Sequence, residues 1–328
     1  MEPKNLYCGI DVHKESYTGC VMDASGNIVR ENDFPPDKEA FERFVCGISN
    51  AEIEIAIEAC GIWRGAYKSL TGLGYNVRLA NPKKTHDIAC SKKTDKVDAK
   101  TLADLLRTKY LPEVYIPDED VLKLRDLARH KSSLTRLRVE VQVKIKSYLL
   151  RDGVKYKKGL WTEKELFEIA EDDRNIGNLV NIYWNLKAEE KEVMGRIKKT
   201  ARNMRLANLL MTVTGIAEYS AILILAEIGD IKRFKTPKEL ISYAGLCPGI
   251  YQSGDTERNV RNHAVNKWLK WIMYECSGRA GMLDPRFRNH YYKIKERKGV
   301  KTARRSTARK MLTIIWYILT NEEPYRAS

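Results

Sequence analysis

The first third of the chain alternates short apolar runs with turns. Residues 6–10 form an apolar run of strand composition that meets a polar turn. In residues 53–57 three isoleucines alternate with other side chains, which is the pattern of a half-buried strand. Further strands are predicted at residues 17–22, 28–30 and 76–80. The first of these leads through a turn of Asp, Gly and Asn into the second, as in a hairpin.

Helical spacing separates these strands. Residues 37–48 follow two prolines and place apolar side chains on one face. A second helix is predicted over residues 63–73, where a following glycine marks its end, and a third begins at residue 95. Strands interleaved with helices predict a mixed α/β layer arrangement for this part of the chain.

Two long helices are predicted in the middle of the chain. Residues 120–150 contain no Gly or Pro, and Leu127, Leu134 and Val141 recur every seven residues. Residues 176–201 have similar spacing. This pattern predicts either an antiparallel coiled-coil hairpin or a dimerisation arm.

The last third reads as mainly helical. Residues 209–225 resemble a helix-hairpin-helix with Gly215 at its turn, where the second helix could bind a DNA phosphate. Helix pairs in protein cores share this pattern, so the residues leave both readings open. Trp268 and Trp271, three residues apart, are interpreted as core anchors rather than base-stacking platforms.

Charge points to a polyanionic partner. The 328 residues carry a net charge of +15, for which nucleic acid is the usual explanation and solubility the alternative. Lys and Arg outnumber acids by 12 to 3 in residues 121–158 and by 11 to 1 in residues 286–310. Tyr291 and Tyr292 interrupt the second stretch, as in grooves that bind nucleic acid.

The sequence also predicts a cytoplasmic protein without a membrane partner. No apolar run approaches the roughly 20 residues that span a bilayer, and residues 1–5 lack the apolar core of a signal peptide. The seven cysteines are scattered, with no Cys-x-x-Cys pair, and are expected to be reduced thiols.

Four carboxylates are candidate metal ligands. Asp11 and Glu58 end predicted strands, and Asp95 and Asp98 begin a predicted helix. At three residues apart, the two helical carboxylates lie about 60° from one another around the axis and can face one point. Such a set could hold hard cations, including a Mg²⁺ pair suited to phosphoryl transfer. Helix capping is the structural alternative, and the residues alone do not decide between the two.

A family resemblance strengthens the functional reading. Six stretches resemble the signature of the DEDD transposases, insertion-sequence recombinases related to the pilin-gene invertase: Gly9–Lys14, Ile57–Ala59, Lys93–Ala99, Tyr243–Pro248, Gln252–Gly254 and Lys267–Trp271. The resemblance implies an RNase H/RuvC-like α/β metal domain at residues 1–118, a helical coiled-coil arm at 119–205 and a mainly α transposase domain at 206–328.

The resemblance also implies the chemistry. Ser253 matches the serine that attacks the DNA phosphodiester in that family, and Mg²⁺ would be held by the four carboxylates. Many relatives carry a Gly-x-Ile-Thr-Lys-like run after this serine, whereas residues 259–265 read Asn-Val-Arg-Asn-His-Ala-Val here. Arg261 or His263 could therefore replace the usual lysine.

Nucleic acids and further copies of the chain are the expected partners. The resemblance implies donor and target DNA, a structured guide RNA, and a homo-oligomer, dimer or tetramer, that joins the metal domain of one subunit to the serine of another. The residues expected to contact nucleic acid are Arg258, Arg261, Lys298, Lys301, Arg304 and Arg305.

Two other functions remain open from the sequence. One is a structure-selective nuclease, such as a Holliday-junction resolvase, that uses metal-activated water in place of the serine. The other is a non-catalytic DNA- or RNA-binding protein. Covalent attachment to DNA separates the first from a transposase, and metal-dependent cleavage excludes the second.

Overall fold

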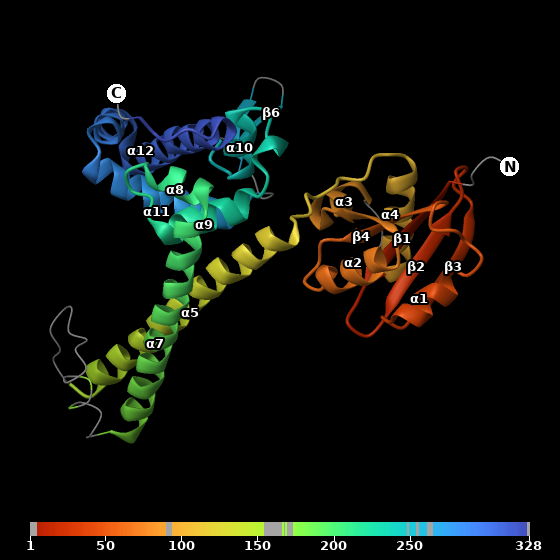
Figure 1. The fold of residues 1–328 in the computed structure, drawn as a ribbon, viewed down its shortest axis with the longest axis horizontal. Coiled ribbons are helices and arrows are strands. Elements are labelled where there is room, and N and C mark those ends of the chain that lie inside the picture. Colours follow the sequence, from red (N-terminus) through yellow and green to blue (C-terminus); the bar gives the residue numbers. More distant parts are fainter. Residues whose placement is uncertain are drawn as a thin grey trace. The chain divides into compact units, whose positions relative to one another are not determined.

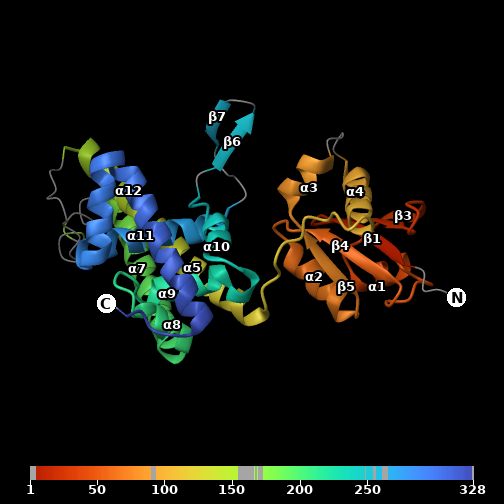
Figure 2. The same ribbon diagram turned by 90° about the horizontal axis from the view of Figure 1, so that it is seen from above.

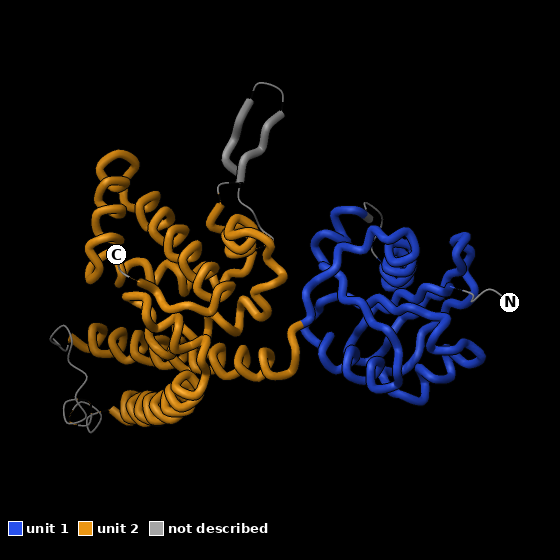
Figure 3. The backbone as a smooth tube through the Cα atoms, turned by 45° about the horizontal axis from the view of Figure 1, so that its top comes forward, with its two compact units in different colours: residues 1–116 blue, residues 117–328 orange. Residues whose placement is uncertain are grey.

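The chain divides into two compact units, residues 1–116 and residues 117–328 (Figure 3). The structure is a computed structural model, and it describes residues 5–89, 94–153, 166, 168, 173–247, 249–253, 256–260 and 265–326. For residues 249–253 and 256–260 the description is of the backbone.

A mixed five-stranded sheet forms the centre of the first unit. Its order is β3 (Ile28–Phe34), β2 (Tyr17–Met22), β1 (Leu6–Val12), β4 (Ile53–Glu58) and β5 (Asn76–Ala80) (Figure 1). The first three strands pair antiparallel, whereas β4 lies parallel to both β1 and β5. The carboxyl ends of β1, β4 and β5 therefore meet at one edge of the sheet.

Helices cover both faces of this sheet (Figure 2). Helices α1 (Lys38–Phe44) and α2 (Trp63–Gly72) bury one face, where their apolar side chains meet the isoleucines of β1 and β4. Helix α4 (Asp95–Arg107) packs on the other face through Ala99, Leu102, Ala103 and Leu106. The expectation of an α/β unit is confirmed.

The contact between α4 and β1 is unusually close at Gly9. A Cβ atom placed on Gly9 would lie 2.5 Å from the backbone nitrogen of Ala103 and closer still to the carbonyl oxygen of Ala99. Real side chains do not tolerate such distances, so glycine is what allows the helix to rest directly on the strand.

Most elements of this unit match the sequence prediction to within a few residues. The exception is α3 (Pro82–Ala89), which the sequence analysis missed. This helix is short and polar, with a proline at its first position. Such a segment carries too little apolar periodicity to be recognised.

Two long antiparallel helices open the second unit. Helices α5 (Glu119–Arg151) and α7 (Arg174–Asn203) run beside one another (Figure 1). Their outer halves share an apolar seam that includes Ile145, Val180 and Tyr183. The prediction of two long helices is therefore confirmed, with bounds one or two residues wider than expected.

The rest of the unit is a helical body around α9 (Glu218–Ile228), in which every residue from Ser220 to Ile228 is buried. Around it lie α8 (Arg205–Met211), a 3₁₀ turn (Ile231–Arg233), α10 (Pro237–Tyr243), α11 (Lys267–Leu283) and α12 (Pro285–Asn321). A β-hairpin of β6 (Gly249–Ser253) and β7 (Thr256–Val260) follows α10.

Helix α12 is one element with a break at Gly299, where φ is +78° and ψ is 171°. The helix includes the whole basic stretch of residues 286–310, as the mainly helical pattern of the last third predicts. Among the described residues, no helix combines the length and the apolar composition that crossing a membrane requires.

We expect Gly9→Ala to destabilise the first unit. The added methyl group must push α4 away from β1, and forced overpacking of this kind costs about 3 kcal/mol of unfolding free energy. Gly65→Ala on α2 is the matched control, because its Cβ would meet nothing within 4 Å. Urea unfolding followed by circular dichroism measures both, and an unchanged midpoint for Gly9→Ala would show that α4 can shift at no cost.

Candidate metal centre and serine hairpin

Asp11 and Glu58 lie side by side at the carboxyl ends of two parallel strands. Ile10 of β1 pairs in register with Ile57 of β4, so the residue after each lies at the same edge of the sheet. Side chains alternate along a strand, and the residues two positions earlier, Gly9 and Ala56, face α4. Asp11 and Glu58 therefore both point to the face that α4 covers.

The first turn of α4 carries the other two carboxylates. Thr94 caps the helix by accepting a hydrogen bond from the Val97 backbone N–H. Asp95 and Asp98 follow in that turn. Ala99 lies over Gly9, one helical turn beyond Asp95. The close contact at Gly9 thus brings the start of α4 to the end of β1.

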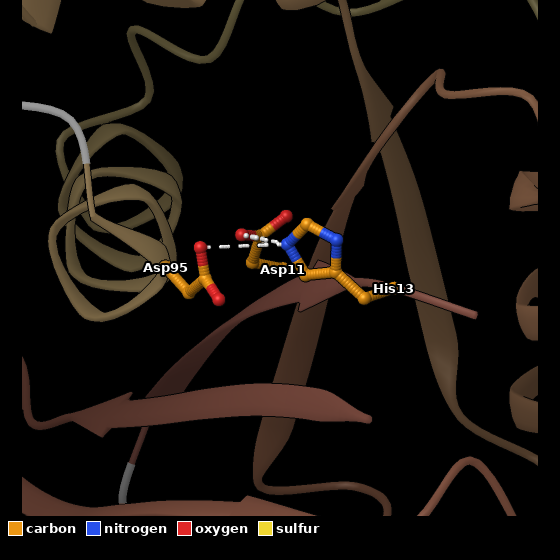
Figure 4. Close-up of side chains that lie close together, drawn as sticks. All are labelled: Asp11, His13 and Asp95. Atoms are coloured by element: carbon orange, nitrogen blue, oxygen red, sulfur yellow. Dashed lines mark hydrogen bonds and ion pairs between the residues drawn. The ribbon is translucent and has the colours of Figure 1, made fainter. Parts of the chain in front are cut away.

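His13 joins the two elements. Its Nε2 atom lies 3.0 Å from Oδ2 of Asp11 and 3.5 Å from Oδ1 of Asp95 (Figure 4). The ligand atoms of these three residues all lie within 4.8 Å of one another, as in a site that could hold a metal ion. His13 lies in the stretch that resembles the transposase signature, and the structure places it in contact with both carboxylates.

The electrostatics favour a positive ion here. Burial raises the pKa of Asp11 above its ordinary value, since its side chain is only 13% exposed. His13 opposes this shift in pKa, whereas the nearby charges of Asp95 and Asp98 add to it. Three carboxylates crowded together repel one another, and a cation among them removes that repulsion.

The donor set fits a hard divalent cation. Carboxylate oxygens predominate, and Mg²⁺, Mn²⁺ and Ca²⁺ prefer such ligands. The structure brings Asp11 and Asp95 together and places Asp98 in the same helical turn. Glu58 adjoins Asp11 through strand register, and its side chain is half-buried.

Ser253 belongs to the second unit. It is the last residue of β6 and pairs with Thr256 of β7. The sequence predicts no strands here, because residues 249–260 are rich in glycine, serine and charged side chains and lack apolar alternation. Arg258 lies in β7 opposite Tyr251, and Arg261 and His263 lie outside the described residues.

Most basic side chains of α12 are exposed. Four that the sequence analysis singled out are exposed on both sides of the break at Gly299: Lys298, Lys301, Arg304 and Arg305. Tyr291 and Tyr292 stand edge-to-face, 5.5 Å between ring centres, and Lys295 lies 5.3 Å from the second ring centre.

One aromatic prediction was wrong. Trp271 was expected to anchor the core, yet 40% of it is exposed. Its ring stacks edge-to-face against Trp268, which does pack on the core, and against Tyr219. A helix turns about 100° per residue, so a three-residue spacing can place one ring at the rim of the buried face.

Comparison with known families accounts for both parts of the chain. Residues 8–151 match a family described as "Transposase", of the DEDD type found in IS110. Residues 207–292 match the "Transposase IS116/IS110/IS902 family". The first match includes all four carboxylates and the second includes Ser253.

Individual relatives agree with these matches. The transposase for insertion sequence element IS1111A of Coxiella burnetii is 22% identical over 97% of this chain and 90% of its own length. The pilin gene-inverting protein of Moraxella bovis is 27% identical over 97% of both chains. A Sinorhizobium fredii protein with a transposase name is 28% identical over 65% of this chain, but the match spans only 55% of that relative.

These matches run in chain order across the α/β unit and the helical unit, and they agree with the motifs around the carboxylates and the serine. The chain therefore belongs to the IS110/IS116 family of DEDD transposases, which are DNA recombinases that act by phosphoryl transfer.

Proposed function

We propose that the protein cuts and rejoins DNA by attack of Ser253 on a phosphodiester, with Mg²⁺ held by Asp11, Glu58, Asp95 and Asp98. The observation that carries this proposal is the approach of α4 to β1, which sets its acidic first turn beside two strand-end carboxylates. A histidine between two of these carboxylates marks the place where a positive charge is favoured.

The chemistry assigns a role to each group. Mg²⁺ would polarise the phosphate oxygens and stabilise the charge that develops on them. Asp11, Glu58, Asp95 and Asp98 would hold the metal ion in place. The Ser253 oxygen forms the new bond to phosphorus as one deoxyribose oxygen leaves, and the serine proton passes to a neighbouring base or water. Arg258 and Arg261 would balance the negative charge of the phosphate.

The finer architecture is part of this proposal. An antiparallel meander continued by two parallel strands, with α4 across one face, supports an RNase H/RuvC-like domain at residues 1–118. The shared apolar seam of α5 and α7 supports a coiled-coil arm at 119–205. Residues 206–328 would form the serine-bearing domain.

A guide RNA and a homo-oligomer complete the proposal. The exposed cations of α12 support binding of donor and target DNA and of a structured RNA. The carboxylates and Ser253 lie on different compact units, which supports a dimer or tetramer that pairs the two across subunits. Because its proposed substrate is cellular DNA, the protein would act in the cytoplasm.

Two alternatives make different predictions. A resolvase-like nuclease would use the same carboxylates with water as the nucleophile, and it would need no serine. A non-catalytic DNA- or RNA-binding protein would cut nothing. The transposase matches over both units favour recombination over either.

Asp11→Asn should abolish Mg²⁺-dependent strand cleavage, by a factor of about 10³ or more, because a ligand to the cation loses its charge. DNA binding should persist, since the exposed basic surfaces are elsewhere. Cleavage of labelled DNA at several Mg²⁺ concentrations measures this. Asp104→Asn, which changes a half-exposed acid further along α4 that pairs with Arg107, is the control. Normal cleavage by Asp11→Asn would remove Asp11 from the site.

The pH dependence of the free energy of unfolding tests separately whether Asp11→Asn is folded. Burial raises the pKa of Asp11 in the folded state, so the folded protein binds this proton more tightly than the unfolded chain. The wild type therefore loses stability as pH rises from about 4 through the raised pKa. In metal-free buffer Asp11→Asn should be the more stable protein at pH 7, and the difference should vanish below about pH 4.

Ser253→Ala should remove both cleavage and the covalent protein–DNA adduct while DNA binding persists, because no other group replaces the nucleophile. Ser242→Ala on α10, an exposed serine of the same unit, should behave as wild type. A denaturing gel of labelled DNA before and after protease digestion detects the adduct. If the wild type cuts DNA without a protease-sensitive band, water is the nucleophile and the resolvase reading replaces this one.

Protein expressed with its native flanking DNA should copurify with one discrete RNA. Changing Arg304 and Arg305 to Glu should weaken its binding and lower the slope of log affinity against log salt by roughly one to two. Lys38→Glu with Arg43→Glu on α1 changes the same charge in the other unit and should leave the slope unaltered. Sequencing the bound RNA decides the matter, and a mixture of host transcripts would refute a dedicated guide.

A further inference from the structure

Glu227 is a fully buried carboxylate that the proposed chemistry leaves unexplained. It lies near the end of α9, among side chains that are all buried, and its own side chain is 0% exposed. A charge removed from water is stable only when ion pairs and hydrogen bonds replace its hydration.

Two arginines of α5 supply the charge. Nε and one terminal nitrogen of Arg129 lie 2.8 and 2.9 Å from the two Glu227 oxygens, a bidentate pair. Arg125 approaches one of these oxygens to 3.8 Å and donates two hydrogen bonds to the Ala226 carbonyl oxygen. Burial lowers the pKa of Arg125, and the charge of Glu227 opposes that shift.

Asn266 completes the set from the other side. Its side-chain Nδ2 donates to a Glu227 oxygen at 2.7 Å and lies 2.9 Å from the Tyr243 hydroxyl oxygen. That hydroxyl donates to the Glu227 backbone carbonyl at 3.2 Å. The Asn266 backbone N–H donates to the Tyr243 carbonyl at 2.8 Å, so the two residues are bonded twice.

These two residues bracket the serine hairpin. Tyr243 is the last residue of α10, and Asn266 caps α11 by accepting from the Leu269 N–H. Between them, Gly245 has φ of +64°, and a Cβ there would meet Val265 at 2.7 Å. The two ends of the segment that carries β6 and β7 are thus in contact with one another, and both are bonded to Glu227.

We propose that Glu227 is a positioning residue that fixes the base of the hairpin and thereby the direction in which Ser253 is presented. This inference rests on the proposed role of Ser253 as nucleophile. A two-stranded hairpin is marginally stable by itself, so the placement of a nucleophile on it depends on the rigidity of the base. Displacement of reacting groups by about 1 Å can slow a reaction about a hundredfold.

The decisive variant is Asn266→Ser. Serine retains the helix cap, but it is too short to reach Glu227 and lacks the amide donor. We expect the single-turnover rate constant for adduct formation to fall by about tenfold or more, with DNA affinity unchanged. A merely destabilised protein would show a smaller reaction amplitude at an unchanged rate constant, so the two readings separate in one time course.

Glu227→Gln and Glu190→Gln form a matched pair. Glu190 of α7 is a partly buried carboxylate. Among the described residues its hydrogen-bond and ion-pair partners are Thr135, Lys131 and Arg138, none of which belongs to the hairpin base. Both changes should lower the melting temperature, but only Glu227→Gln should lower the rate constant. If Glu227→Gln does not fold, Asn266→Ser and Tyr243→Phe carry the test.

The outcomes are distinct. If the wild type forms the adduct, and Asn266→Ser and Tyr243→Phe form it at the wild-type rate, the positioning role is overturned and the serine mechanism stands. Wild type that cuts DNA without an adduct overturns the serine mechanism and the positioning role with it. An equal fall in rate constant for Glu190→Gln also overturns the proposal, because any loss of a buried pair would then suffice.

Discussion

The contact between helix α4 and strand β1 is the constraint on which the candidate metal centre depends. Glycine at position 9 allows the helix backbone to lie directly on the strand, and this sets the distance between the acidic first turn of α4 and the strand-end Asp11. The parallel pairing of β1 with β4 adds Glu58 to the same edge. Like charges brought together by backbone packing repel one another, and the group of Asp11, His13 and Asp95 that results could hold a cation.

The positive charge of the second unit is more structured than its composition indicates. Arg125 and Arg129 are committed to buried Glu227, and Lys131 and Arg138 are committed to Glu190. These four cations of α5 therefore form ion pairs that hold helices together, whereas the basic side chains of α12 near Gly299 are exposed.

Local pattern was sufficient for the five strands of the first unit, the two long helices and the placement of the four carboxylates at strand ends and a helix start, because each rests on alternation, spacing or a strand end. It was insufficient where tertiary packing decides. Arg129 and Glu227 are 98 residues apart in sequence, and nothing local pairs them. A single acid within the apolar run of α9 was the available signal that a buried partner existed. Trp271 fell at the rim of a helical face whose edge only the assembled body defines.

The break at Gly299 divides the basic stretch of α12 into two parts. Because the backbone leaves helical geometry there, the cations before and after it belong to two helical segments with different axes. The conformation of one glycine, with φ of +78°, sets the direction between these segments, and residues with a side chain rarely adopt it. A side chain at position 299 would therefore reorient the two sets of cations without removing any of them.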